Sequence, residues 1–164
     1  GDIEAGDFTR GDAFSLLPFA NTLVKIEITG SELKQVMEEG IAYSISDGGS
    51  TRAYPYGAGI RYSIDLTKNF GDRVANLQIW DKSSDTWQPV RPRDNYVLVT
   101  NSFIAGGQDG YDTFHSLAER GRATHTGIDY AQAMADYASE VEVLLRPEEF
   151  ATQSYVPVTN KETN

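Results

Sequence analysis

The fold is indicated most clearly by one continuous stretch of the sequence, Tyr96-Val97-Leu98-Val99-Thr100-Asn101-Ser102-Phe103-Ile104-Ala105. Residues 96–100 are apolar on both faces of an extended chain, which predicts a central strand buried above and below. The strand is followed at once by Phe103 and by the glycine-rich segment 106–110, a composition typical of a tight turn. We therefore expect a buried strand that ends in a turn carrying aromatic and polar side chains.

Alternation of apolar and polar residues predicts three further strands. Residues 23–28 place Val24, Ile26 and Ile28 on one face and charged residues on the other. The same alternation recurs at residues 60–66, and residues 74–80 follow after a turn. Residues 82–86 have the composition of a hairpin turn.

Helical spacing is present in three places. Thr29 and Glu32 have the spacing of a capping box, and apolar residues recur at helical intervals from Leu33 to Ile41. A second helix is expected at residues 112–120. Thr126 and Asp129 are expected to cap a third helix. The apolar stripe of that third helix is Tyr130, Met134, Tyr137 and Val141.

The order of these elements is strand, helix, several strands and then helices. This order favours an α+β class, a single domain with a mixed, largely antiparallel sheet and packed helices. A chain of 164 residues with 40% hydrophobic content is long enough for one such core. We expect one domain over residues 1–150, cut from a longer chain, and a polar C-terminal tail over residues 151–164 that is frayed from Ser154 onward.

Composition and motifs exclude several classes of function. The net charge of −10 argues against a nucleic acid polymer as partner, because such binding depends on clustered Lys and Arg. The chain has no cysteine and no apolar run of membrane-spanning length, and its first residues lack the basic and apolar regions typical of a signal peptide. His115 and His125 have no second ligand at a metal-binding interval, and the carboxylates are dispersed. We therefore expect no catalytic residue and no metal site in this chain, and no membrane partner.

Two distant segments each pair an aromatic ring with a polar side chain beside a strand. Phe19 is followed by Asn21, and Phe103 is followed by Asp109. A flat ligand needs two apolar faces for stacking and a few polar groups at its edge. Each residue alone has a structural alternative, a core ring for the two phenylalanines and a turn position for the polar residues. The combination favours a clamp for a flat ring.

The same segments carry a family resemblance that extends over residues 1–150. The matching motifs include Leu17-Pro18-Phe19-Ala20-Asn21, Gly59-Ile60-Arg61-Tyr62, Thr100-Asn101-Ser102-Phe103-Ile104-Ala105 and Asp109-Gly110-Tyr111. With these motifs the chain resembles the C-terminal, substrate-binding domain of the 5'-nucleotidase family, which includes periplasmic 5'-nucleotidase/UDP-sugar hydrolases and ecto-5'-nucleotidases.

The resemblance implies a role for five residues. Phe19 and Phe103 would sandwich the base. Asn21 would form a hydrogen bond to the base, and Asp109 would form hydrogen bonds to the ribose hydroxyls. Arg52 would lie at the position of a backbone contact to the ligand, in the loop before Tyr54-Pro55. Two departures stand beside these residues: Ala20 replaces a glycine, and Gln108 replaces a glycine next to Asp109. If residue 108 needs a positive φ, the glutamine would strain the turn.

The resemblance also implies what the rest of the protein contains. An N-terminal metallophosphatase domain of the same polypeptide would hold two divalent metal ions and hydrolyse a nucleoside 5'-monophosphate to nucleoside and phosphate. The isolated chain would be inactive, and the location would be periplasmic or extracellular, at the cell surface.

Two groups of alternatives stay open. The first is a related metallophosphoesterase: a 2',3'-cyclic phosphodiesterase, a UDP-sugar hydrolase or a thiosulfate-processing enzyme. The second is a non-nucleotide structural module. A ring of Phe19 or Phe103 buried in the core would favour the structural module.

Overall fold

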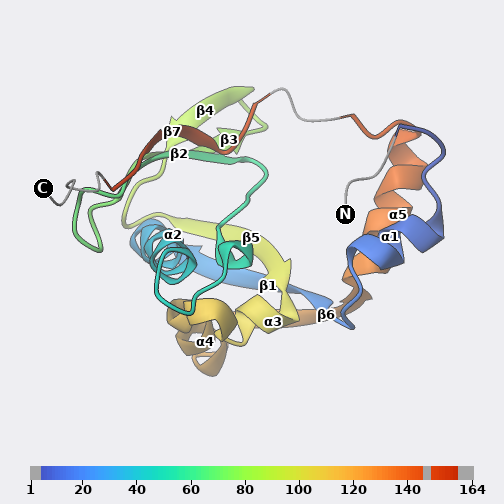
Figure 1. The fold of residues 1–164 in the computed structure, drawn as a ribbon, viewed down its shortest axis with the longest axis horizontal. Helices are drawn as coiled ribbons and strands as arrows, with labels where there is room; N and C mark the ends of the chain where they lie inside the picture. The colour runs from blue at the N-terminus through green and yellow to red at the C-terminus, as the bar shows by residue number, and fades with distance from the viewer. Residues whose placement is uncertain (1–4, 146–148, 159–164) are drawn as a thin grey trace, which may run out of the picture.

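The computed structural model describes residues 5–145 and 149–158, and it arranges them as two sheets with a long helix between them (Figure 1). The α+β class and the largely antiparallel pairing are as predicted, with the strands divided between two sheets. The helices are α1 (Arg10–Leu16), α2 (Gly30–Ser44), α3 (Ser102–Ala105), α4 (Asp112–Glu119) and α5 (Tyr130–Val141), with 3-10 turns η1 (Thr51–Ala53) and η2 (Gln108–Gly110). The strands are β1 (Thr22–Thr29), β2 (Ile60–Asp65), β3 (Val74–Asp81), β4 (Thr86–Pro89), β5 (Asn95–Asn101), β6 (Ala123–Asp129) and β7 (Thr152–Val156).

The first sheet has the order β5-β1-β6 and is antiparallel throughout. Val24, Ile26 and Ile28 of β1 are fully buried, as their alternation predicted. The prediction of a central strand at residues 96–100 was wrong, because β5 is at the edge of this sheet. Val97 and Val99 are each 60% exposed. A run of apolar residues is compatible with a strand that is covered on one face or on both faces. Composition alone therefore could not show whether β5 is central or at the edge of the sheet.

Helix α2 begins with the predicted capping box, in which Thr29 Oγ1 accepts from the Glu32 N–H at 3.3 Å and Glu32 accepts from the Thr29 N–H at 2.8 Å. Its apolar positions serve two cores. Leu33 and Val36 pack in the cluster built on the first sheet, whereas Met37 and Ile41 pack in the cluster built on the second. The two cores explain why α2 lies between the sheets (Figure 1).

A buried carboxylate fastens α2 to the second sheet. Glu38 is fully buried, and it accepts hydrogen bonds from the N–H of Val74 at 2.6 Å and of Gly71 at 3.0 Å. These two donors lie at the start of β3 and in the turn before it, so α2 fixes the position of that turn.

The second sheet has the order β4-β3-β2-β7, and the predicted hairpin turn at residues 82–86 joins β3 to β4. Strand β7 pairs in parallel with β2, Ser63 opposite Ser154 and Ile64 opposite Tyr155. The expectation of a frayed end was therefore wrong for residues 154–156, because their backbone groups bond to the edge of the sheet (Figure 1). Residues 159–164 of the expected tail lie outside the described residues, and the domain boundary stays a prediction.

The helices near the two ends of the chain differ most from expectation. Helix α5 is present, but its N-cap is Asp129, which accepts from the N–H of Ala131 and Gln132, each at 2.9 Å. Thr126 lies instead in β6, a strand that the sequence did not indicate. Tyr137 is 58% exposed, because the small residues of α5, rather than its large ones, are buried.

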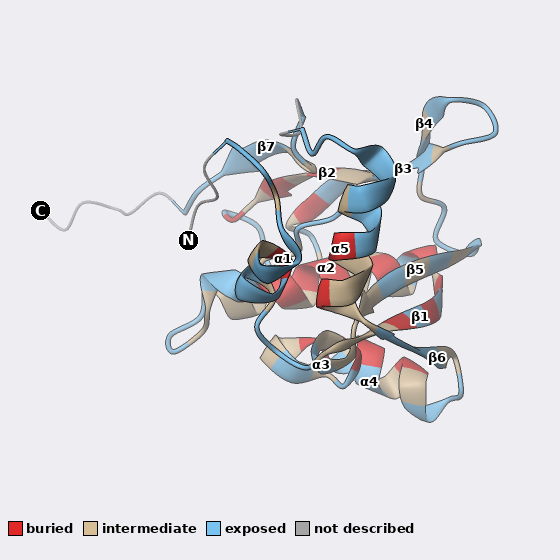
Figure 2. Ribbon diagram, turned by 90° about the vertical axis from the view of Figure 1, so that its right-hand side faces the viewer, coloured by how far each residue is buried: buried red, intermediate tan, exposed pale blue. Residues whose placement is uncertain are grey.

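Helix α1 was not predicted, and it packs along α5 at one side of the molecule (Figure 2). Ala13 of α1 is fully buried, as is Ala131 of α5, and an Arg10–Gln132 hydrogen bond joins the two helices. In the part of the chain that the structure describes, no helix has the length and apolar character needed to cross a lipid bilayer.

Candidate functional site

The two predicted clamp segments lie at the same end of the first sheet. Leu23 at the start of β1 pairs with Asn101 at the end of β5, and Thr22 pairs with Asp129 at the end of β6. Antiparallel pairing thus brings the residues before β1 together with those after β5. The segments that carry Phe19 and Phe103 become neighbours.

Ser102 joins these segments through its hydroxyl. Its Oγ donates to the Asn21 Oδ1 at 3.1 Å and accepts from the Thr22 N–H at 3.1 Å. Asn101 caps α3 by accepting from the Ile104 N–H at 3.0 Å, so the chain turns into a single helical turn directly after β5. Asn21, half-buried, is held at the junction of the two segments.

The backbone of Phe19 is held by Tyr130. The Phe19 N–H donates to the Tyr130 hydroxyl at 3.1 Å, and the Tyr130 N–H donates to the Asn21 carbonyl at 3.1 Å. The first turn of α5 therefore fixes the turn that presents this ring.

Both predicted rings are exposed. Phe19 is 64% exposed and Phe103 is 45% exposed, whereas Ala105 of the same short helix as Phe103 is buried. These values exclude the alternative that either ring is a core residue. Stacking on a base stays a prediction for both rings.

Asp109 lies in a turn of left-handed residues. Its φ is +56°, between Gly107 at +84° and Gly110 at +81°. Aspartate tolerates this region better than most residues. Gln108 does not have a positive φ, so a glutamine at the position where the family has a glycine does not strain the backbone of this turn.

The turn with Asp109 is tied to the turn with Arg52. Tyr111 is buried, and its hydroxyl donates to the carbonyl of Ala53, next to Arg52, at 2.7 Å. Burial raises the pKa of Tyr111, and the Asp109 carboxylate raises it further, so the hydroxyl stays a neutral donor. Arg52 is exposed, and its N–H donates to Ser50 Oγ at 3.2 Å. Two separate turns are thus fixed in one region beside α2.

The family follows from comparison with known proteins. The model of the 5'-nucleotidase C-terminal domain matches residues 1–116. The chain belongs to this family.

This 5'-nucleotidase C-terminal domain is similar to two relatives in sequence and to a solved structure in fold. It is 43% identical over 117 residues to NAD 5'-nucleotidase of Haemophilus influenzae, covering 71% of this chain and 19% of the relative. It is 39% identical over 137 residues to a probable 5'-nucleotidase of Treponema pallidum, covering 83% of this chain and 23% of the relative. The structure of Haemophilus influenzae NAD nucleotidase superposes with a TM-score of 0.85 at 31% identity, covering 92% of this chain and 27% of that one. This C-terminal domain thus spans about a fifth of the length of these relatives.

The sequence did not indicate the two residues that hold the segment of Phe19 and Asn21 in place in this C-terminal domain. Ser102 lies within the motif at residues 100–105, but nothing in its sequence context indicates a bond to Asn21. Tyr130 was assigned to an apolar stripe, whereas its hydroxyl accepts from Phe19, 111 residues away. Only the pairing of β1 with both neighbours brings these residues into contact.

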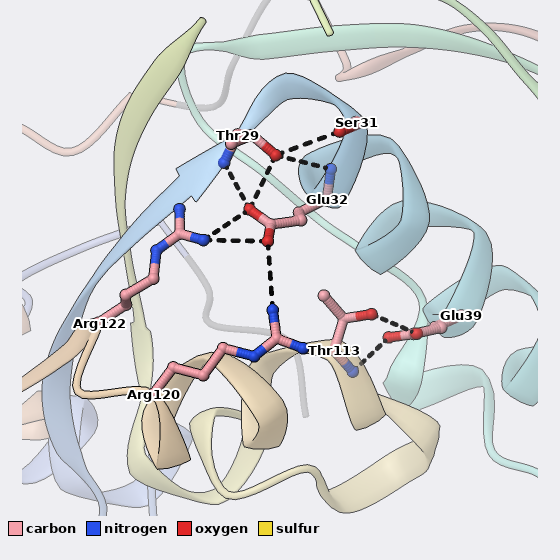
Figure 3. A network of polar contacts seen from close by, with 7 residues as sticks. All are labelled: Thr29, Ser31, Glu32, Glu39, Thr113, Arg120 and Arg122. Carbon is pink, nitrogen blue, oxygen red and sulfur yellow. Dashed lines mark hydrogen bonds and ion pairs between the residues drawn. The ribbon is translucent and has the colours of Figure 1, made fainter. Parts of the chain in front are cut away.

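Two acidic residues of α2, Glu32 and Glu39, make polar contacts with α4 and the residues after it (Figure 3). Glu32 accepts from Arg122 Nη1 at 2.9 and 3.0 Å, and Arg120 lies 3.9 Å away. Partial burial opposes ionisation of Glu32, but the hydrogen bonds from Thr29 and the charge of Arg122 outweigh it and lower its pKa. Glu39 accepts from the N–H and the hydroxyl of Thr113, at 3.1 and 2.6 Å. Both contacts join α2 to the segment that follows the Asp109 turn.

Proposed function

We propose that this domain is the nucleoside-binding part of a metal-dependent 5'-nucleotidase, which hydrolyses nucleoside 5'-monophosphates to nucleoside and phosphate. One observation carries the proposal. Phe19 and Phe103, 84 residues apart in the sequence, are both exposed at adjoining strand ends that hydrogen bonds fasten together. Rings this exposed contribute less to the core than buried rings do, and flat faces near polar groups suit a nucleobase.

The polar groups suit the remaining parts of a nucleoside. Because Asn21 Oδ1 accepts from Ser102, its amide NH₂ group is the part that can donate to a base. Asp109 is a carboxylate on a rigid turn, and a carboxylate accepts well from two vicinal hydroxyls. Arg52 supplies a cation in the turn that Tyr111 ties to that of Asp109.

Under this proposal the phosphate chemistry belongs to an N-terminal metallophosphatase domain of the same polypeptide. Within residues 5–145 and 149–158 no group of three or more His, Cys, Asp or Glu side chains is placed to hold a metal ion. Two divalent ions in that other domain would activate a water molecule for attack on phosphorus. This domain would bind and orient the nucleoside, and the whole protein would act in the periplasm or at the cell surface.

Calorimetric titration of the 164-residue chain tests the proposal, with adenosine, AMP and NAD as ligands and ribose 5-phosphate as the control without a base. Adenosine and AMP should bind with similar affinity, because this domain recognises base and ribose, and ribose 5-phosphate should bind far more weakly. A phosphate-release assay with AMP and added Mn²⁺ should show no turnover. Turnover by this chain alone, or equal binding of ribose 5-phosphate, would contradict the proposal.

A further inference from the structure

An open groove lies on the second sheet, outside the site described above. It is bordered by the C-terminal end of α2, by η1, by the loop at residues 54–57 and by residues 149–155 before and within β7. Its volume is about 680 Å³, within the range of about 300–1,000 Å³ that holds small ligands. The parallel addition of β7 to β2 supplies one wall of this groove. Phe19, Asn21, Arg52, Phe103 and Asp109 are all absent from its lining.

Four aromatic side chains line the groove. Tyr54 and Tyr56 stand at its loop side, with ring centroids 4.9 Å apart and ring planes at 51°, so they form a corner rather than a flat stack. Phe150 and Tyr155 come from the opposite wall. Tyr56, Phe150 and Tyr155 are 81%, 68% and 50% exposed. Three large rings around one concavity leave aromatic faces open to a ligand.

The charge of the lining limits the chemistry of that ligand. Among the described residues that line the groove, Glu149 is the one that carries a charge, and none of them is a Lys or Arg. The chain as a whole has a net charge of −10. A phosphate or carboxylate group in this groove would be repelled, whereas a cation would be attracted by the carboxylate and by the negative faces of the rings.

We propose that this aromatic groove binds a flat cationic ring of the N-alkylpyridinium class. The rings of Tyr54, Tyr56, Phe150 and Tyr155 surround the flat cation, and Glu149 balances its charge. The hydroxyl of Tyr54 is hydrogen-bonded to Thr152, so this tyrosine contributes its ring face. The groove shares no residue with the nucleoside clamp, so binding here does not depend on the proposed nucleotidase function.

Two probes of nearly the same size, which differ in the position of one methyl group, separate charge from shape. 1-Methylnicotinamide carries its methyl group on the ring nitrogen and is a cation, whereas N-methylnicotinamide carries it on the amide and is neutral. Titration of the 164-residue chain, followed by NMR chemical shifts of the aromatic side chains, should show the cation binding at least fivefold more tightly than the neutral compound. The shifts should centre on Tyr56, Phe150 and Tyr155. Equal binding of the two probes, no binding of the cation, or shifts centred on Phe19 and Phe103 would each overturn the proposal.

Matched variants test the assignment to this groove. Tyr155→Leu keeps an apolar side chain but removes the ring, and Glu149→Gln keeps the shape but removes the charge. Each should weaken binding of the cation about fivefold and leave binding of adenosine unchanged. Tyr137→Leu, at a tyrosine of similar exposure on α5, should have no effect. If Tyr155→Leu unfolds the chain, Glu149→Gln still decides, because its side chain is on the surface. An unchanged affinity in Glu149→Gln, or an equal loss in Tyr137→Leu, would overturn the assignment.

Discussion

The Ser102 hydroxyl donates a hydrogen bond to the Asn21 side-chain oxygen at 3.1 Å, joining two residues that are 81 positions apart. The Ser102 Oγ also accepts a hydrogen bond from the N–H of Thr22. The two clamp segments therefore share one hydroxyl as their link. If the clamp binds a nucleoside, a change at Ser102 should alter binding without touching either ring.

We expect Ser102→Ala to lower both stability and nucleoside affinity. The substitution leaves the Thr22 N–H without its acceptor and frees the Asn21 amide, at a cost of about 1–3 kcal/mol in the free energy of unfolding. Urea denaturation and adenosine titration measure the two effects. Ser139→Ala is the control, because the Ser139 hydroxyl bonds to the Ala135 carbonyl of its own helix. Wild-type adenosine affinity in Ser102→Ala would show that this link does not position the clamp.

Phe103→Ala should weaken binding of adenosine by about 1–3 kcal/mol, the usual contribution of one aromatic ring stacked on a base. Its effect on stability should be small, because the ring is 45% exposed. Phe114→Ala serves as the matched control, since Phe114 is buried and its loss should cost about 3–5 kcal/mol of stability. Calorimetry and thermal denaturation separate the two outcomes. A large loss of stability with unchanged affinity in Phe103→Ala would assign this ring a structural role.

Gly40→Ala should destabilise the protein by about 1–3 kcal/mol. A Cβ atom at residue 40 would lie 2.2 Å from the Tyr111 hydroxyl oxygen and 3.0 Å from the Ala53 carbonyl oxygen, the two atoms that bond to each other. The added methyl group therefore disrupts the bond between the turns of Arg52 and Asp109, and adenosine affinity should fall as well. Gly11→Ala in α1 is the control, because its nearest contact would be an ordinary 3.5 Å. Equal stabilities of the two variants would refute this account.

The Glu32 network should make stability depend on pH in the acid range. Hydrogen bonds from Thr29 and the charge of Arg122 lower the pKa of Glu32 below its usual value of 4.5 in spite of partial burial. A carboxyl whose pKa is lower in the folded state stabilises the protein above the unfolded pKa, and this contribution is lost as the pH falls below it. Wild type should thus exceed Glu32→Gln in stability at neutral pH, and the difference should shrink below pH 4.5.

Urea denaturation of both proteins across this pH range measures that difference. Glu119→Gln is the matched control, because the Glu119 side chain is 69% exposed and pairs only loosely with His115, at 3.6 Å. This control should follow wild type at every pH. A gap between wild type and Glu32→Gln that stays constant down to acid pH would mean that the Glu32 charge makes no contribution.

Local signals in the sequence predicted the elements that have strong local causes. The capping box of Thr29 and Glu32, the alternation in β1 and β2 and the hairpin turn at residues 82–86 are all present. The errors fall where local signals are ambiguous. Thr126 and Asp129 both suit an N-cap, and the pairing of β6 with β1 makes Asp129 the cap.

The sequence by itself determined the class of fold, the family and the residues proposed to contact a nucleoside. These follow from side-chain period, turn composition and ordered motifs, all of which act over a few neighbouring residues. Only the tertiary structure decided that β5 is an edge strand and that β7 adds to β2. It also decided that Ser102 joins Asn21 to the end of β5 and that Tyr130 joins Phe19 to the start of α5. These features depend on which backbone edges pair and which faces remain uncovered. Strand pairing and burial depend on the free energy of the whole packed chain, so they cannot be predicted from a short segment.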